Sequence, residues 1–251
     1  MIILYRTTPS SFMKAAMLSR LRKGCCLHED ELSESILNDG VIDVDNLNMD
    51  DVRRDYEKVF GTVGWLDGPK ARSLAKASLY SSRYIARDRY HLVINIMKQA
   101  LVYGPDYVLG RVSREARTFF NRARRVCIEI SRACGFIRLE PAECPAGCVM
   151  AGRVEFTNDI SDIVLRKLSR RSKNAPVYLV EKDTAYFLSG RKTASCHVRD
   201  LPFDLPDGGF SEFWEAYYDS QFIEGRKNLS LARKHLPQKC WSWVPEGKKL
   251  R

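Results

Sequence analysis

The helical pattern of residues 49–135 constrains the fold of this chain more than any other feature. Apolar residues recur there at the three- and four-residue spacing of amphipathic helices. The pattern is broken at residues 61–68 and at the Gly-Pro pair of residues 104–105, where proline cannot continue a helix. We expect four helices in this stretch, and the longest is predicted to cover about residues 106–134.

Beyond residue 135 the pattern changes to short β-prone runs, which predict two hairpins and a further strand. The expected strands are residues 135–140, 148–156, 177–180, 185–188 and 195–198. One helix is expected between the hairpins, after residue 159, and another over residues 210–226. We therefore predict an α+β fold, with a mainly helical N-terminal half followed by a small, mostly antiparallel sheet with flanking helices. We expect a single compact unit over residues 1–251, which residues 1–134 and 135–251 would subdivide.

The N-terminal residues predict a strand over residues 2–5 and then a helix, which Thr-Pro-Ser-Ser caps and Gly24 ends. The acidic stretch of residues 29–51 is predicted to be an exposed connection with turns. The opening residues hold too few apolar side chains for a signal peptide, and no segment has the length and apolarity of a membrane span. Because there is no export signal, the eight cysteines favour reduced thiols and a cytoplasmic protein.

The charge of the chain favours an anionic partner. It has 41 lysines and arginines against 31 aspartates and glutamates, which gives a net charge of +10 and a pI near 9.2. Such an excess raises the local concentration of polyanions, of which nucleic acid is the commonest. Composition alone leaves open a basic protein without a polyanionic partner.

The predicted helix over residues 106–134 separates apolar and basic residues onto opposite sides when successive residues are placed about 100° apart. Its apolar side comprises Val112, Ala116, Phe119, Phe120, Ala123, Val126, Cys127, Ile130, Ala133 and Cys134. An arc of roughly 80° on the other side holds five arginines, with two more flanking it. The five are Arg111, Arg114, Arg122, Arg125 and Arg132, and the flanking pair is Arg117 and Arg124.

This arginine side is a candidate phosphate-binding face, because a guanidinium presents a planar fork of donors to phosphate. The basic run that contains Arg170 and Arg171 is predicted to add to it. Glu115 and Glu129 lie at the edge of the arc. They leave open the alternative of a solvated helix face with intrahelical ion pairs.

The C-terminal segment mixes aromatic and basic side chains of the kind that stack unpaired bases. Arg226 and Trp241 are its predicted contacts with nucleic acid. Trp214 and Tyr218 also have the spacing of one helix face, so a place in the core remains an alternative for these two.

The sequence contains no complete catalytic or metal-binding motif. Cys25, Cys26 and His28 are close together, but no paired C-x2-C motif of a structural zinc site and no C-x3-C-x2-C motif of a radical-SAM cluster is present. Gly-rich phosphate loops, G-x-S-x-G and H-E-x-x-H are absent as well. We therefore expect no metal and no cofactor, and the sequence assigns no catalytic residue.

The C-terminal segment resembles a microbial family of DNA metabolism proteins, through an aromatic helix, an Ile-Glu-x-Arg-x-Asn element and a Pro-to-Trp tail. The residues that carry the resemblance are Trp214, Tyr218, Glu224, Arg226, Asn228, Pro237 and Trp241. The resemblance implies a role in DNA repair or modification beside a radical-SAM protein, since members are encoded next to one and related domains are fused to a uracil-DNA glycosylase-like domain. It implies no reaction, because the function of the family's central domain is unknown.

This chain departs from the family at two places, where Ile130-Ser131 and Lys167-Leu168 stand in place of family histidines. The leading expectation is a nucleic-acid-binding accessory protein in DNA repair or modification, with DNA favoured over RNA and a radical-SAM or glycosylase-type partner. One alternative is an enzyme acting on a nucleobase or nucleotide at a pocket near Glu224, Arg226 and Asn228. The other is a protein-interaction scaffold.

Overall fold

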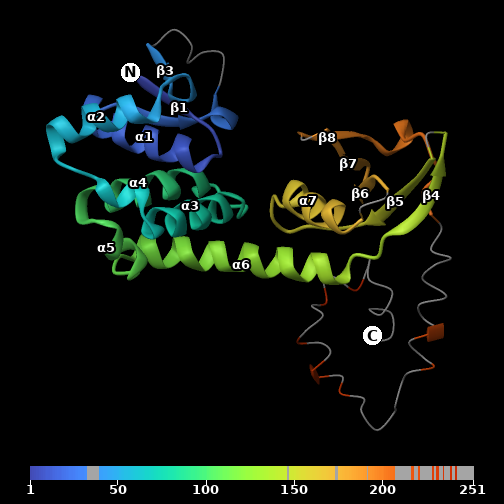
Figure 1. Cartoon of the computed structure of the whole chain (residues 1–251). Helices are drawn as coiled ribbons and strands as arrows, with labels where there is room; N and C mark the ends of the chain where they lie inside the picture. Colours follow the sequence, from blue (N-terminus) through green and yellow to red (C-terminus); the bar gives the residue numbers. More distant parts are fainter. Residues whose placement is uncertain are drawn as a thin grey trace. The chain divides into compact units, whose positions relative to one another are not determined.

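The computed structural model describes residues 1–32, 40–145, 147–172, 175–190 and 192–206, together with isolated positions between 216 and 241. The chain divides into two compact units, Met1–Ile128 and Glu129–Arg251, which are described separately (Figure 1). The predicted α+β fold is confirmed, with helices in the first half and a five-stranded, mostly antiparallel sheet in the second. The single compact unit stays a prediction. Among the described residues, no helix has the length and apolarity that a membrane span requires.

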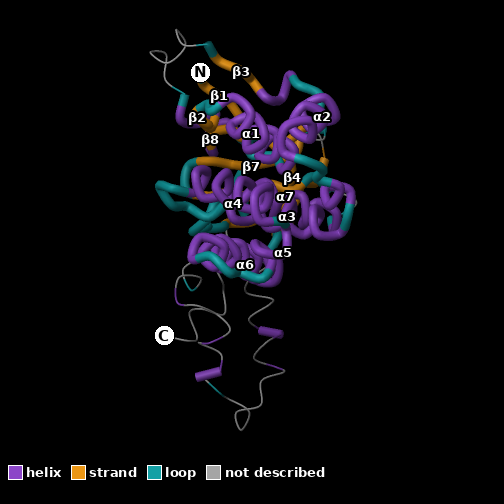
Figure 2. The backbone as a smooth tube through the Cα atoms, turned by 90° about the vertical axis from the view of Figure 1, so that its left-hand side faces the viewer, coloured by secondary structure: helices purple, strands orange, loops and turns teal. Residues whose placement is uncertain are grey.

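Unit 1 opens with a three-stranded parallel sheet and continues with helices. Its strands and α-helices are β1 (Ile2–Tyr5), α1 (Pro9–Arg22), β2 (Cys25–His28), β3 (Val41–Asp43), α2 (Met49–Phe60), α3 (Pro69–Ser82), α4 (Arg89–Tyr103), α5 (Pro105–Leu109) and α6 (Arg114–Phe136), which continues into unit 2. β1 lies between β2 and β3 and pairs with both in parallel (Figure 2). Parallel neighbours need a crossover connection, and α1 supplies the one between β1 and β2.

Helix α1 is the central helix of unit 1. Thr8 caps it by accepting a hydrogen bond from the Ser11 amide at 3.1 Å, and Pro9 occupies the first turn, where no backbone donor is needed. Residues 11–19 are all buried, so α1 is covered on every side and not along one stripe. It packs against β1 and against helices α2, α3 and α4.

The acidic stretch of residues 29–51 is largely exposed at its described positions, as predicted, but it is more than a connection with turns. Its described residues form two short 3-10 helices, strand β3 and the start of α2, and Val44 within it is fully buried. Strand β2 was not expected either. Both strands are short, and their own sequence gives little indication of a strand. They form because their backbones pair with β1.

The long helix predicted over residues 106–134 is two helices, α5 and α6, so residues 49–135 form five α-helices and not four. The break falls at Gly110, where an added Cβ would lie 2.9 Å from the Asp106 carbonyl oxygen, and at Arg111, whose φ of 56° is left-handed. Two residues predicted for the core are exposed. Val112 lies in the break and is 58% exposed, and Cys127, at the edge of the apolar side, is also exposed.

Unit 2 contains a sheet in the order β4-β5-β6-β7-β8, with one helix packed against β6 and β7. The elements are β4 (Glu140–Cys144), β5 (Gly147–Arg153), α7 (Ser161–Arg171), β6 (Val177–Glu181), β7 (Thr184–Ser189) and β8 (Lys192–His197). All neighbours are antiparallel except β5 and β6, which α7 connects. Both predicted hairpins are present, but the first strand of the first one is Glu140–Cys144 and not residues 135–140, because α6 continues through Phe136. The helix expected over residues 210–226 falls on residues described only at isolated positions.

Candidate nucleic-acid interface

Helix α6 turns one side toward the interior of unit 1 and the other toward solvent. Ala116, Phe119, Ala123 and Val126 on the inner side are each at most 6% exposed. The outer side carries four exposed arginines, which we call the arginine row: Arg114, Arg117, Arg124 and Arg125. All of them belong to unit 1.

The arginine row runs along the helix axis. Arg114 and Arg117 lie one turn apart, and the other two follow two turns later, so the row extends over about 16 Å. Within the described residues, no carboxylate forms an ion pair with any of the four. Among the described residues these guanidinium groups therefore have no carboxylate counter-charge, and apart from the donor that Arg125 gives to Tyr84 their donors can serve an external anion.

The turn between α3 and α4 adds a tyrosine beside this row. Arg125 donates a hydrogen bond from Nη1 to the Tyr84 hydroxyl at 3.2 Å, and the Arg122 guanidinium lies 5.5 Å from the centroid of the same ring. Arg122 is also paired with Asp88 at 2.9 Å, and its side chain is only 15% exposed. Arg122 therefore holds α6 to the turn, while the exposed Arg87 adds a further positive charge there.

The remaining predicted arginines occupy other surroundings. Arg111 precedes α6, and its guanidinium lies over an aromatic ring of that helix, 5.0 Å from the centroid. In unit 2, Arg132 is half-buried and Arg170 is exposed. Arg171 donates a hydrogen bond to the Cys134 carbonyl at 3.0 Å, so it ties α7 to the end of α6.

Most residues of the C-terminal motif lie outside the described residues, namely Trp214, Tyr218, Glu224, Arg226 and Pro237. Asn228 is described, and its side-chain oxygen accepts hydrogen bonds from the Ser230 hydroxyl at 2.8 Å and from the Leu231 amide at 2.9 Å. Trp241 is half-buried. An enzyme pocket built on this motif stays a prediction.

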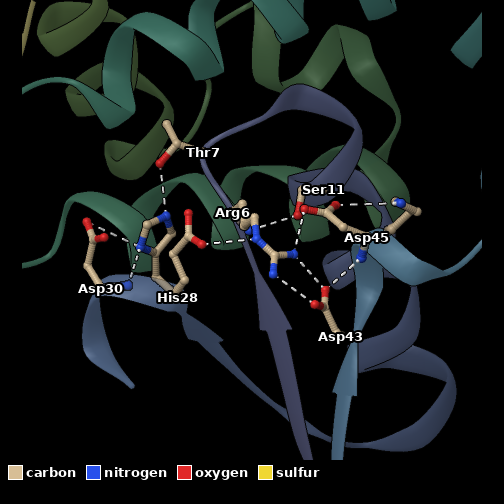
Figure 3. A network of polar contacts seen from close by, with 9 residues as sticks. Arg6, Thr7, Ser11, His28, Asp30, Asp43 and Asp45 are labelled. Carbon is tan, nitrogen blue, oxygen red and sulfur yellow. Dashed lines mark hydrogen bonds and ion pairs between the residues drawn. The ribbon is translucent and has the colours of Figure 1, made fainter. Parts of the chain in front are cut away.

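A second group of polar side chains lies at the carboxyl end of the parallel sheet in unit 1 (Figure 3). We call it the carboxyl-edge network. Arg6 follows β1 and forms ion pairs with Glu29 at 3.0 Å, Asp43 at 2.8 Å and Asp45 at 3.0 Å. Glu29 follows β2, Asp43 is the last residue of β3, and Asp45 lies just beyond it. The guanidinium of Arg6 therefore joins the ends of all three strands. Hydrogen bonds from Arg6 hold the pKa of Asp43 below its usual range.

The same network contains a buried lysine. Lys14 lies on α1, its Nζ donates to the Leu47 carbonyl at 3.1 Å, and Asp45 is 3.7 Å away. Burial of an ammonium group is tolerated where it has both an acceptor and a counter-charge. Both cations of the carboxyl-edge network therefore have a counter-charge within the network.

His28, at the end of β2, is 1% exposed and stacks on Tyr90 with ring centroids 3.5 Å apart. Its Nδ1 accepts a hydrogen bond from the Asp30 amide at 3.1 Å, which places the ring hydrogen of neutral His28 on Nε2. Nε2 then donates to Thr7 Oγ1 at 2.9 Å. Burial lowers the pKa of His28, against the opposing effect of Asp30 and Glu31.

Tyr90 completes this side of the network. Its hydroxyl donates to Asp30 Oδ2 at 2.5 Å, and burial together with this hydrogen bond raises the pKa of Tyr90 to about 12. His28 and Tyr90 are therefore both neutral near pH 7. His28, Tyr90 and Asp30 are joined by hydrogen bonds, but His28 has almost no exposed surface through which a substrate could reach it.

A cavity of about 240 Å³ lies between α1, α2 and α3, with Met13, Met49 and Met97 among its lining residues. Its lining also includes Asp50, Arg53 and Asp67. Arg53 is paired with Asp67 at 2.8 Å, so the cavity presents carboxylate charge and no free cation from these groups. A phosphate group is not favoured there.

Sequence reasoning missed Tyr84 and Arg87 of the interface and the role of His28 in the network. Tyr84 and Arg87 lie in a turn between helices, where hydrophobic periodicity carries no information. The nearest sequence indication for His28 was its closeness to Cys25 and Cys26, which form no complete metal-binding motif with it. Within the described residues, no three candidate ligands converge as a metal site.

Comparison with protein-family models finds that DUF4130, a domain of unknown function, matches residues 87–246. No curated protein and no solved structure matches the chain. The matched residues include α4, α5 and α6 and every strand of unit 2, so the arginine row lies inside the family domain, whereas β1, β2 and β3 precede it. Since the match covers well over half of the chain, this protein belongs to the DUF4130 family, whose defining domain has no known function.

Proposed function

We propose that the protein binds nucleic acid through the arginine row of α6 and acts as an accessory protein in DNA repair or modification. The observation that carries the proposal is the row itself, four exposed guanidinium groups without a carboxylate partner among the described residues. Arginine pairs with phosphate through two parallel hydrogen bonds and releases counterions as it does so. The net charge of +10 adds long-range attraction for the same ligand.

Contacts of this kind position a nucleic acid without reading its sequence. Binding through the row is therefore expected to be sequence-tolerant and strongly dependent on salt. Chemistry would come from a partner. The resemblance to DNA metabolism proteins favours DNA over RNA and a radical-SAM or glycosylase-type protein as that partner.

The proposal is tested by fluorescence anisotropy of labelled oligonucleotides over a salt series. The double variant Arg117→Ala/Arg124→Ala removes two charges from the row, and neither side chain has a described partner to lose. If each arginine neutralises one phosphate, the slope of log K against log salt should become shallower by about 1.4 for single strands and about 1.8 for duplex.

The matched control is Arg54→Ala/Lys58→Ala on α2, which removes the same charge from side chains that are 66% and 65% exposed. The control should leave the slope unchanged. Equal changes in both double variants would mean that net charge, and not the row, attracts the ligand. Absence of binding at low salt would overturn the proposal.

A further inference from the structure

Two tyrosines that precede the arginine row in the chain lie close together. Tyr103 ends α4 and is 64% exposed, and Tyr107 belongs to α5. Their ring centroids are 4.8 Å apart, with an interplanar angle of 40°. Val102, beside them, is 51% exposed. Single exposed apolar residues are ordinary, but a ring supported by a second ring offers a flat, pre-positioned apolar surface.

The tyrosine pair is connected to the start of α6 by two hydrogen bonds. The Val112 amide donates to the Tyr107 carbonyl at 3.3 Å. The Ser113 hydroxyl donates to Gln99 Oε1 at 2.7 Å, and Gln99 lies one helical turn before Tyr103 on α4. The first arginine of the row follows Ser113 directly. The pair and the row are therefore joined by a short connection within unit 1.

The charges around the pair suit a polyanion. Asp106, beside Tyr107 in the chain, is paired with Lys70 at 2.6 Å, so its carboxylate is compensated. On the other side of Tyr107, Arg111 is exposed and its guanidinium is supported by the Phe120 ring at 5.0 Å. Next to Tyr107 the chain therefore presents the exposed guanidinium of Arg111, and the carboxylate of Asp106 is already paired.

We propose that Tyr103, supported by Tyr107, is a stacking platform for an unpaired base of a single-stranded nucleic acid whose phosphates lie on the arginine row. This inference rests on the proposed function and adds the class of ligand. Every nucleobase has a π-face, so stacking on an aromatic side chain tolerates any sequence. Bases inside a duplex already stack on one another, so the platform selects single strands and unpaired ends.

The experiment compares three ligands of equal length: an oligo-dT strand, a strand with the same phosphates but abasic sugars, and a duplex. Wild-type protein should bind oligo-dT at least about fivefold more tightly than the abasic strand, since one stacked base supplies this factor or more. Tyr103→Leu keeps an apolar side chain without a π-face. This variant should bind oligo-dT and the abasic strand equally. Tyr103→Phe should restore the preference.

The outcomes separate this inference from the one on which it rests. Salt-dependent binding of the abasic strand, with no preference for oligo-dT in the wild type, would overturn the platform and leave the arginine row standing. An unchanged preference in Tyr103→Leu would also overturn the platform. Failure to bind any of the three ligands would overturn both proposals. Circular dichroism of each variant confirms that the exposed substitution leaves the fold intact.

Discussion

Unit 1 uses its arginines in two opposite ways. At the carboxyl-edge network, Arg6 has three carboxylates within 3.0 Å, one just after β2 and two at or just after the end of β3. On α6, the arginine row has no carboxylate partner among the described residues. A guanidinium that is paired with carboxylates of its own chain stabilises the fold. The guanidinium groups of an unpaired row repel one another, and binding of an external anion relieves this repulsion.

The two regions also differ in their relation to the family. The DUF4130 match begins at residue 87, so it includes the arginine row and excludes Arg6 and its carboxylates. The charge that we connect with function therefore lies in the shared domain. The charge that we connect with stability lies in the sheet that precedes it.

The largest effect on stability is expected from Arg6→Met. This change leaves Glu29, Asp43 and Asp45 near one another without the cation that joins them, and Lys14 alone remains as counter-charge. We expect the midpoint of thermal unfolding at pH 7 to fall by about 5 °C or more. Differential scanning calorimetry measures the change.

Arg54→Met is the matched control, because Arg54 forms a single exposed pair with Asp51 and should change the midpoint little. The loss caused by Arg6→Met should shrink in acid, where protonation of the carboxylates removes their repulsion. Equal midpoints for the two variants would show that the carboxyl-edge network does not stabilise unit 1.

A smaller, pH-dependent effect is expected from His28. Its pKa in the folded protein is below the ordinary value near 6.5, so the unfolded chain binds the proton more readily. The stability due to neutral His28 is therefore fully present above pH 6.5 and is lost as the pH falls toward the folded pKa. Protonation would also remove the lone pair that accepts from the Asp30 amide.

The measurement is the thermal midpoint of wild type and His28→Asn between pH 7 and pH 5. Asparagine can still cap the turn but does not titrate, so the decline of the midpoint with acid should be shallower in the variant. His197→Asn is the control for loss of a capping histidine, because His197 accepts from the Arg199 amide at 3.1 Å but is exposed. Parallel declines in wild type and His28→Asn would contradict the prediction.

The sequence predicts those parts of the fold that are determined by residues close together in the chain. Thr8 and Pro9 indicate the start of α1, and the two short β-prone runs within residues 177–188 indicate the hairpin of β6 and β7. Strands β2 and β3 depend on pairing with β1, and the break at Gly110 is hidden because apolar periodicity continues across it. These features follow from contacts between distant residues, which a single sequence does not report.

The candidate interface shows the same division. Helical periodicity places arginines on the outer side of α6, and four of them are exposed there. Periodicity also placed Arg122 inside the arc with Arg117 and Arg124 at its margins. In the structure Arg122 is the one drawn inward, because Asp88, 34 residues earlier, pairs with it. Which arginines remain for solvent is thus decided by a tertiary partner.

The smallest effect on stability is expected at the arginine row. Arg117→Ala/Arg124→Ala should change the free energy of unfolding by no more than about 0.5 kcal/mol for the two sites together, since neither guanidinium has a described partner. Arg122→Ala should lower it by about 1 kcal/mol, because this change removes the Asp88 pair and the packing on Tyr84. Urea unfolding at pH 7 measures both.

If the double variant lost as much stability as Arg122→Ala, the row would be part of the structural framework, and its exposed charge would no longer distinguish it from the carboxyl-edge network. A double variant that keeps its stability but loses salt-dependent binding would instead assign the row to the ligand alone.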